Sequence, residues 1–138
     1  MEKILLPVDL AHGEKAEALI GEAVKYAKGR DVSFTMLHVV TPMPGYMMAE
    51  LPELFEEKTL ESARNRLDEF ARKHASAIKA TTMIRTGVAQ HEIIAAAKEI
   101  GADLIIIASH KPEAADYLLG SVAAAVVRHA PCSVLVHR

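Results

Sequence analysis

The sequence predicts an α/β fold in which a five-stranded parallel sheet carries helices on both faces. Short, continuously apolar runs alternate with longer segments whose apolar residues recur every three or four positions. Strands that alternate with helices in this way favour a parallel sheet covered on both sides. At 138 residues the chain has the length of one domain, and we expect a single domain over residues 1–138.

The first half of the chain predicts two strands and two helices. Residues 3–8 are a short apolar run typical of a buried strand, and an apolar face predicts a helix over 14–30. Residues 32–40 have the composition of a second strand. Two prolines and a glycine predict a loop over 41–50. A long helix follows, with apolar residues at helical spacing over 60–74.

The second half of the chain continues the alternation. Gly87 and Gly101 are expected to end a strand and a helix respectively, and Pro131 stops the last helix. The first of these strands alternates only weakly and predicts a sheet edge, as does the short terminal strand. The expected elements are a strand at 78–85, a helix at 89–100, a strand at 104–108, a helix at 119–129 and a strand at 132–137.

Composition excludes several classes of protein. A formal net charge of −2 gives no reason to expect nucleic acid or an anionic membrane as partner. The single cysteine, Cys132, cannot form a disulfide within the chain, which fits a reducing compartment. No signal peptide and no apolar run of membrane-spanning length are visible. We therefore expect a soluble cytoplasmic protein.

The segment 104–138 says most about function. A buried strand leads through a polar loop into a helix that opens on Gly120-Ser121. Unpaired N–H groups and the helix dipole favour a phosphate at such a position. Gly120 lets the backbone approach a ligand, and Ser121 adds a hydroxyl. The pattern predicts a site for a phosphorylated ligand, a nucleotide in particular; the alternative is a plain helix start capped by Ser121.

Four motifs together resemble the universal stress protein family. They are ILLPVDL near the start, LHVV at the end of the second strand, ADLIIIASH around the fourth, and LLGSVAAAVVRHAPCSVLV at the end. The Ser-His-Lys-Pro run is similar to the small enterobacterial F-type branch. This resemblance implies a Rossmann-like sheet of order 3-2-1-4-5 and a stress-response protein that binds ATP, ADP or AMP.

The resemblance also implies residue roles. The backbone of Val39 would meet the adenine, while Asp9 would contact the ribose or a Mg²⁺ ion held through the nucleotide; the alternative for Asp9 is a turn and helix cap. The implied nucleotide-binding residues are Pro7, Val8, Asp9, Val39, Ala108, Ser109, His110, Lys111, Gly120, Ser121 and Val122.

The chain departs from the glycine pattern of the family's nucleotide binders. Ala108 and Lys111 stand where two glycines would be, and the spacer 112–119 is one residue short. Either nucleotide binding is lost, or a remodelled loop binds phosphate through Ser109, His110 and Lys111. In the first case the protein would act without nucleotide, through dimer and partner surfaces.

Other features complete the expectations. No Walker-type loop and no converging general base are present, so we expect at most slow ATP hydrolysis and no efficient enzyme. The terminal strand 132–137 is apolar, and family members commonly dimerise through it, which implies a homodimer that could pair further into a tetramer. His38, inside the second strand, is expected to pack in the core, and Cys132 to be a buried structural thiol.

Overall fold

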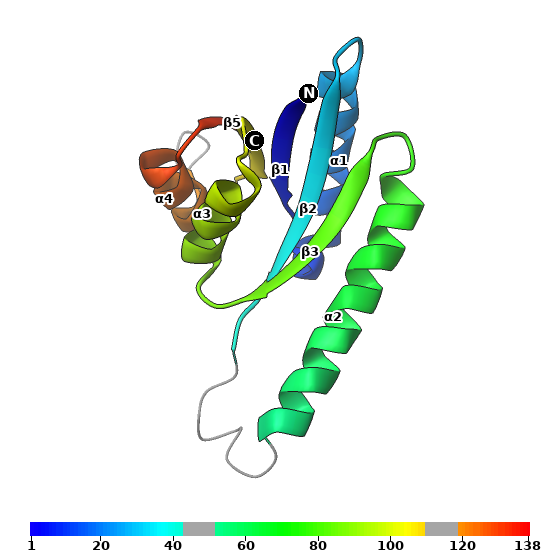
Figure 1. The fold of residues 1–138 in the computed structure, drawn as a ribbon, viewed down its shortest axis with the longest axis vertical. Coiled ribbons are helices and arrows are strands. Elements are labelled where there is room, and N and C mark those ends of the chain that lie inside the picture. The colour runs from blue at the N-terminus through cyan, green and yellow to red at the C-terminus, as the bar shows by residue number, and fades with distance from the viewer. Residues whose placement is uncertain (43–51, 110–118) are drawn as a thin grey trace.

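The computed structural model describes residues 1–42, 52–109 and 119–138, except for the side chains of residues 52–57. Its elements follow the predicted alternation along the chain (Figure 1). They are β1 (Glu2–Pro7), the 3₁₀ helix η1 (Leu10–His12), α1 (Gly13–Ala27), β2 (Val32–Val40), α2 (Pro52–His74), β3 (Ala80–Thr86), α3 (Ala89–Ile100), β4 (Leu104–Ala108), α4 (Ser121–His129) and β5 (Ser133–His137).

The five strands form one parallel sheet in the order β3-β2-β1-β4-β5, which confirms the predicted fold and strand order. β3 and β5 are the two edges, as their weak or short apolar patterns indicated. The chain moves from β1 outward to β3, then returns to the other side of β1 with β4 and β5. The strand order therefore reverses between β1 and β4, and such a switch point is where open α/β sheets bind ligands.

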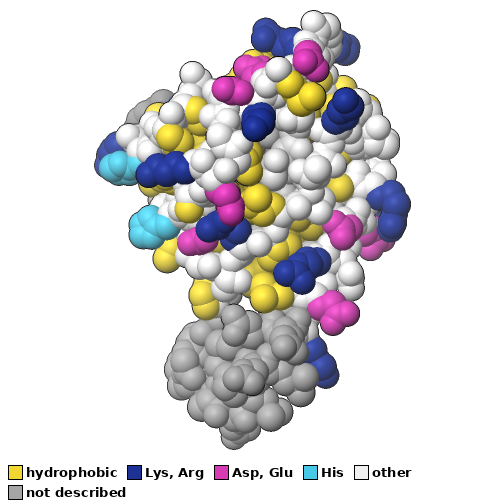
Figure 2. Space-filling view, viewed as in Figure 1, with side chains coloured by type: hydrophobic (Ala, Val, Ile, Leu, Met, Phe, Trp, Pro, Cys, Tyr) yellow, Lys and Arg dark blue, Asp and Glu magenta, His cyan; other side chains and the backbone are white. Residues whose placement is uncertain are grey.

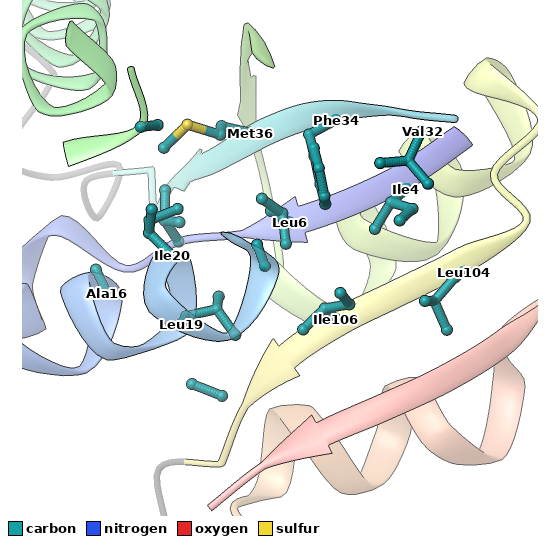
Figure 3. Close-up of a cluster of buried hydrophobic side chains, with 14 of the residues drawn as sticks. Ile4, Leu6, Ala16, Leu19, Ile20, Val32, Phe34, Met36, Leu104 and Ile106 are labelled. Carbon is teal, nitrogen blue, oxygen red and sulfur yellow. The ribbon is translucent and has the colours of Figure 1, made fainter. Parts of the chain in front are cut away.

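Helices cover both faces of the sheet because successive strand side chains point to opposite sides. On one face, Ile4, Leu6 and Ile106 pack with residues of α1 such as Leu19, as Figure 3 shows. Leu67 of α2 is fully buried in the same cluster. On the other face, the strand residues Leu5, Leu37, Ile105 and Ile107 pack against Ile93, Ala96 and Ala97 of α3 and Ala123 and Val126 of α4.

Several element boundaries differ from the sequence prediction. The helix predicted to reach residue 30 ends at Ala27, because Gly29 adopts a left-handed backbone with φ of 70°. The last helix begins at Ser121 instead of residue 119, since Gly120 has extended backbone angles. The third strand begins at Ala80 instead of residue 78, because the N–H of Ile78 donates to the carbonyl of Ala75 in the turn after α2. η1 was not predicted, and at three residues it is too short for periodicity to reveal.

The surface mixes both signs of charge. Figure 2 shows Lys and Arg side chains interspersed with Asp and Glu over the described part of this face, in keeping with the formal charge of −2. Within the described ranges, no helix combines the length and the apolar composition that a bilayer crossing requires.

Candidate functional site

A cleft of about 180 Å³ opens at the carboxyl ends of β1, β2 and β4. It lies at the switch point of the strand order, where the fold class places its ligands. Six of the residues that the resemblance implied lie in its lining: Pro7, Val8, Asp9, Val39, Ala108 and Val122. The remaining lining residues are Ala16, Leu19, Leu37, His38, Thr41, Ala89, Ile93 and Ile107.

Most of the cleft wall is apolar. α1 contributes Leu19 and α3 contributes Ile93, each from the core-facing side of its helix. Polar groups enter at only three described positions, Asp9, His38 and Thr41. An apolar hollow with a few convergent polar groups is the usual form of a small-molecule site. This one could enclose a flat, uncharged ring while leaving charged substituents at its mouth.

Asp9 lies where β1 gives way to η1. Its side chain accepts a hydrogen bond from the backbone N–H of Ala11 at 3.0 Å, which caps the 3₁₀ helix. The second carboxylate oxygen is 2.8 Å from Nδ1 of His12. The predicted capping role of Asp9 is thereby confirmed. Its role toward a ribose or a metal ion stays a prediction, which the position of the carboxylate in the cleft lining supports.

Ser109 follows β4 and is 5% exposed. Its hydroxyl oxygen accepts a hydrogen bond from the backbone N–H of Gly120 at 3.0 Å, and its own N–H donates to the carbonyl of His137 at 2.9 Å. Ser109 therefore fixes the residue that precedes α4. The Gly120 N–H, a candidate donor to phosphate, already has this partner in the described structure.

The N-terminus of α4 borders the cleft through Val122. Gly120 occupies the cap position, so the interpretation of Ser121 as the cap is wrong; Ser121 is the first helical residue. The N–H groups of Ser121, Val122 and Ala123 have no acceptor within the helix, because the first intrahelical bond runs from Ala124 to the Gly120 carbonyl. Val122, in this first turn, lines the cleft.

His38 is the residue that the sequence analysis missed. The prediction that it packs in the core is wrong: it is only half-buried and borders the cleft. Its Nδ1 lies 3.1 Å from the carbonyl oxygen of Val8, and since a carbonyl only accepts, Nδ1 carries the hydrogen. Nε2 is then the ring nitrogen left for a ligand. The available signal was its position near the carboxyl end of a strand, at the ligand-binding edge of the sheet.

His110, Lys111 and most of the predicted loop 41–50 lie outside the described residues. Over the ranges that are described, no group of three or more His, Cys, Asp or Glu side chains could hold a metal ion. Cys132 is half-buried, and burial raises the pKa of its thiol, so it is protonated at neutral pH and has the character of a structural cysteine.

The fold and the cleft define a Rossmann-like α/β protein with a cleft at the switch point of its sheet. Within that class the chain belongs to the universal stress protein family, whose profile matches residues 1–138. Universal stress protein G of Shigella flexneri is 31% identical to it over 144 residues, covering 98% of this chain and 97% of the relative.

Several solved structures share the fold of this chain. The structure of the hypothetical protein MJ0577 superposes with a TM-score of 0.79 and 26% identity, covering 98% of this chain and 94% of that one. Two more distant structures share the fold. One is a universal stress protein in complex with cAMP (TM-score 0.70, 18% identity, 99% and 96% covered). The other is the Archaeoglobus fulgidus protein in complex with dAMP (TM-score 0.68, 20% identity, 100% and 98% covered).

Proposed function

We propose that the cleft binds an adenine nucleotide, ATP, ADP or AMP, and that the protein acts in the stress response as a regulatory binding module. The observation that carries this proposal is the orientation of α4. Its first turn opens on the cleft through Val122, with N–H groups that no helical carbonyl accepts. This arrangement favours a phosphate at one end of the cleft, and the apolar wall favours a base at the other.

The remaining groups fit the parts of a nucleotide. The backbone of Val39, at the end of β2, would meet the adenine edge, beside the wall formed by Pro7 and Val8. The Asp9 carboxylate would accept from ribose hydroxyls. Ala108 closes the wall near α4. Two proteins of the same fold hold cAMP and dAMP, which supports adenine as the base.

Mg²⁺ would enter with the nucleotide. Asp9 is the one carboxylate in the described cleft lining, and Mg²⁺ sites in nucleotide-binding proteins commonly combine one or two carboxylates with phosphate oxygens and water. The donor set therefore fits an ion held by the nucleotide and Asp9 together. It does not fit a metal held by the protein alone.

We infer a binding role and, at most, slow ATP hydrolysis. Efficient phosphoryl transfer needs cations that stabilise the transferred group and a residue that orients the attacking water. The described lining of the cleft contains no lysine or arginine that could stabilise a transferred phosphoryl group.

A homodimer through strand 132–137 forms part of the same proposal. β5 is an edge strand of the sheet, and among the described residues one of its sides has no partner strand. Pairing two such edges would join the sheets of two subunits, and dimers could pair further into tetramers. Light scattering after size exclusion should give about twice the chain mass of 15.0 kDa; a mass of one chain at micromolar concentration would contradict the dimer.

Val122 offers a sharp test of nucleotide binding. Val122→Glu places a carboxylate in the first turn of α4. There its negative charge interacts favourably with the helix dipole but repels a phosphate. Val122→Gln has nearly the same shape without the charge. ATP should raise the melting temperature of the wild type and of Val122→Gln by linkage. We expect Val122→Glu to bind at least about tenfold more weakly, a difference of about 1.4 kcal/mol.

The outcomes separate the two functional alternatives. Equal affinities of the Glu and Gln variants would show that no phosphate lies at the α4 N-terminus. If millimolar ATP, ADP or AMP with Mg²⁺ leaves the wild-type melting temperature unchanged, the protein functions without nucleotide. In that case its dimer and partner surfaces carry the function. Native mass spectrometry of freshly purified protein checks the same point by detecting a retained adenylate.

A further inference from the structure

A second hollow, of about 350 Å³, lies beside the cleft, between the end of β2 and the middle of α2. We call it the α2 groove. Its lining consists of His38, Val40, Lys58, Thr59, Ser62, Ala63 and Arg66. His38 also lines the cleft, so its imidazole is part of the wall between the two hollows. None of the motifs that indicated the nucleotide site includes the α2 residues of the groove.

The helix face above the groove is polar, and Ser62 and Arg66 are exposed beside the buried Ala63. Thr59, Ser62, Ala63 and Arg66 follow the spacing of one helical face. Leu67, one turn beyond Ala63 on the same face, is fully buried against the sheet. The face therefore changes from an apolar contact to two hydroxyls and a guanidinium, and the groove lies under this polar part.

Within the described residues, the charged side chains that line the groove are all cationic. Its described lining holds Lys58 and Arg66 and no carboxylate, and in the part of the chain that the structure describes neither cation forms an ion pair. Arg85 shows the contrasting arrangement, since Glu92 and Glu99 each approach it to 2.8 Å. Two unpaired cations in one hollow create a positive potential that attracts anions.

The donor set indicates which anion the groove would take. A guanidinium can bind two oxygens of a phosphate at once, and an ammonium adds a point charge. The hydroxyls of Thr59 and Ser62 are further donors within the same lining. Because Nδ1 of His38 donates to the Val8 carbonyl, Nε2 of the neutral ring is an acceptor and adds no donor for an anion. The other four groups, the guanidinium, the ammonium and the two hydroxyls, suit oxygen atoms that carry negative charge.

We propose that the α2 groove is a second anion site, which binds a phosphate-bearing group independently of the nucleotide cleft. Arg66 and Lys58 neutralise the phosphate, and Ser62 and Thr59 donate hydrogen bonds to it. The proposal rests on residues of α2 that the nucleotide site does not use. Free inorganic phosphates and the phosphates of a larger metabolite share this chemistry, so the test uses inorganic pyrophosphate and AMP as separate probes.

The first experiment compares two double variants by calorimetric titration of pyrophosphate into the full chain at low salt. Lys58→Gln with Arg66→Gln removes both groove cations. Arg64→Gln with Arg72→Gln removes the same charge from exposed positions of α2 outside the groove. We expect the groove variant to bind at least about tenfold more weakly and the control to stay within about twofold of wild type. Equal weakening of both variants, or no binding to the wild type, would overturn the proposal.

The second experiment locates the bound ion. Pyrophosphate should shift the backbone amide resonances of Thr59, Ser62 and Arg66, and the ring resonances of His38, while AMP should shift those near the α4 N-terminus. Pyrophosphate shifts confined to Ser121, Val122 and Ala123 would place the ion in the cleft and exclude the groove. The groove assignment and the nucleotide assignment therefore fail separately. Circular dichroism of each variant confirms that the fold is retained.

Discussion

Replacing Ser109 by alanine isolates the hydrogen bond that fixes the start of α4. The hydroxyl of Ser109 accepts from the N–H of Gly120 at 3.0 Å, and both residues are buried. In Ser109→Ala this N–H keeps its buried position but loses its acceptor. An unsatisfied buried polar group costs about 1–3 kcal/mol. We expect the free energy of unfolding to fall by that amount.

The expected change in melting temperature follows from the size of the chain. Unfolding entropy is about 2.1 cal/mol/K per residue, or about 0.3 kcal/mol/K for 138 residues. A loss of about 1–3 kcal/mol then lowers the melting temperature by about 3–10 °C. Thermal unfolding followed by circular dichroism measures this directly, and urea unfolding gives the free energy.

Ser133→Ala is the matched control for this measurement. Ser133 is exposed at the start of β5, so the same atoms are removed without leaving a buried donor unpaired. We expect its melting temperature to stay close to wild type. If Ser109→Ala and Ser133→Ala unfold at the same temperature, the hydroxyl of Ser109 does not hold the helix start, and the reasoning is wrong.

Two further predictions concern a glycine and the cysteine. Gly87→Ala should destabilise the protein by about 1–3 kcal/mol in urea unfolding, because Gly87 has a φ of 151° and a Cβ there would approach the Glu92 side chain to 2.9 Å. Gly21→Ala, in an open helical position, should instead stabilise by about 0.5–1 kcal/mol, and the opposite order would refute the argument. For Cys132, burial raises the pKa of the thiol, so iodoacetamide should react with it more slowly at neutral pH than with a free cysteine. Because the folded state keeps this proton to higher pH than the unfolded state, the contribution of Cys132 to stability is complete below the ordinary thiol pKa and falls as pH rises above it. Fast alkylation of Cys132 at neutral pH would contradict the raised pKa.

Much of the fold could be predicted because both faces of the sheet demand apolar side chains. The strand 104–108 is apolar throughout, and the structure buries every residue of it. Helix ends were harder to predict, because they depend on backbone angles that composition does not specify. Gly29 ends α1 through a positive φ, whereas Gly21 lies within the same helix without interrupting it.

The site was predicted in outline only. Asp9 and Ala108 were assigned to the site through the family resemblance, and both line the cleft because parallel strands end on one side of the sheet. The partners of Ser109 and His38 could not be predicted, since each bond joins residues far apart in the sequence. The α2 groove was missed for a similar reason: polar residues on a long helix normally indicate a solvated face, and only the packing of α2 shows that they border a hollow.

Ser109 also joins two regions that the proposed function treats separately. Its N–H extends the pairing of β4 with β5 through His137, and its hydroxyl holds the residue before α4. A displacement of the terminal strand by a neighbouring subunit would therefore reach the ligand-facing helix through one side chain. By thermodynamic reciprocity, the affinity of two chains for each other and the affinity of each for its ligand would then change by the same factor. A ligand titration repeated at several protein concentrations would read this coupling directly.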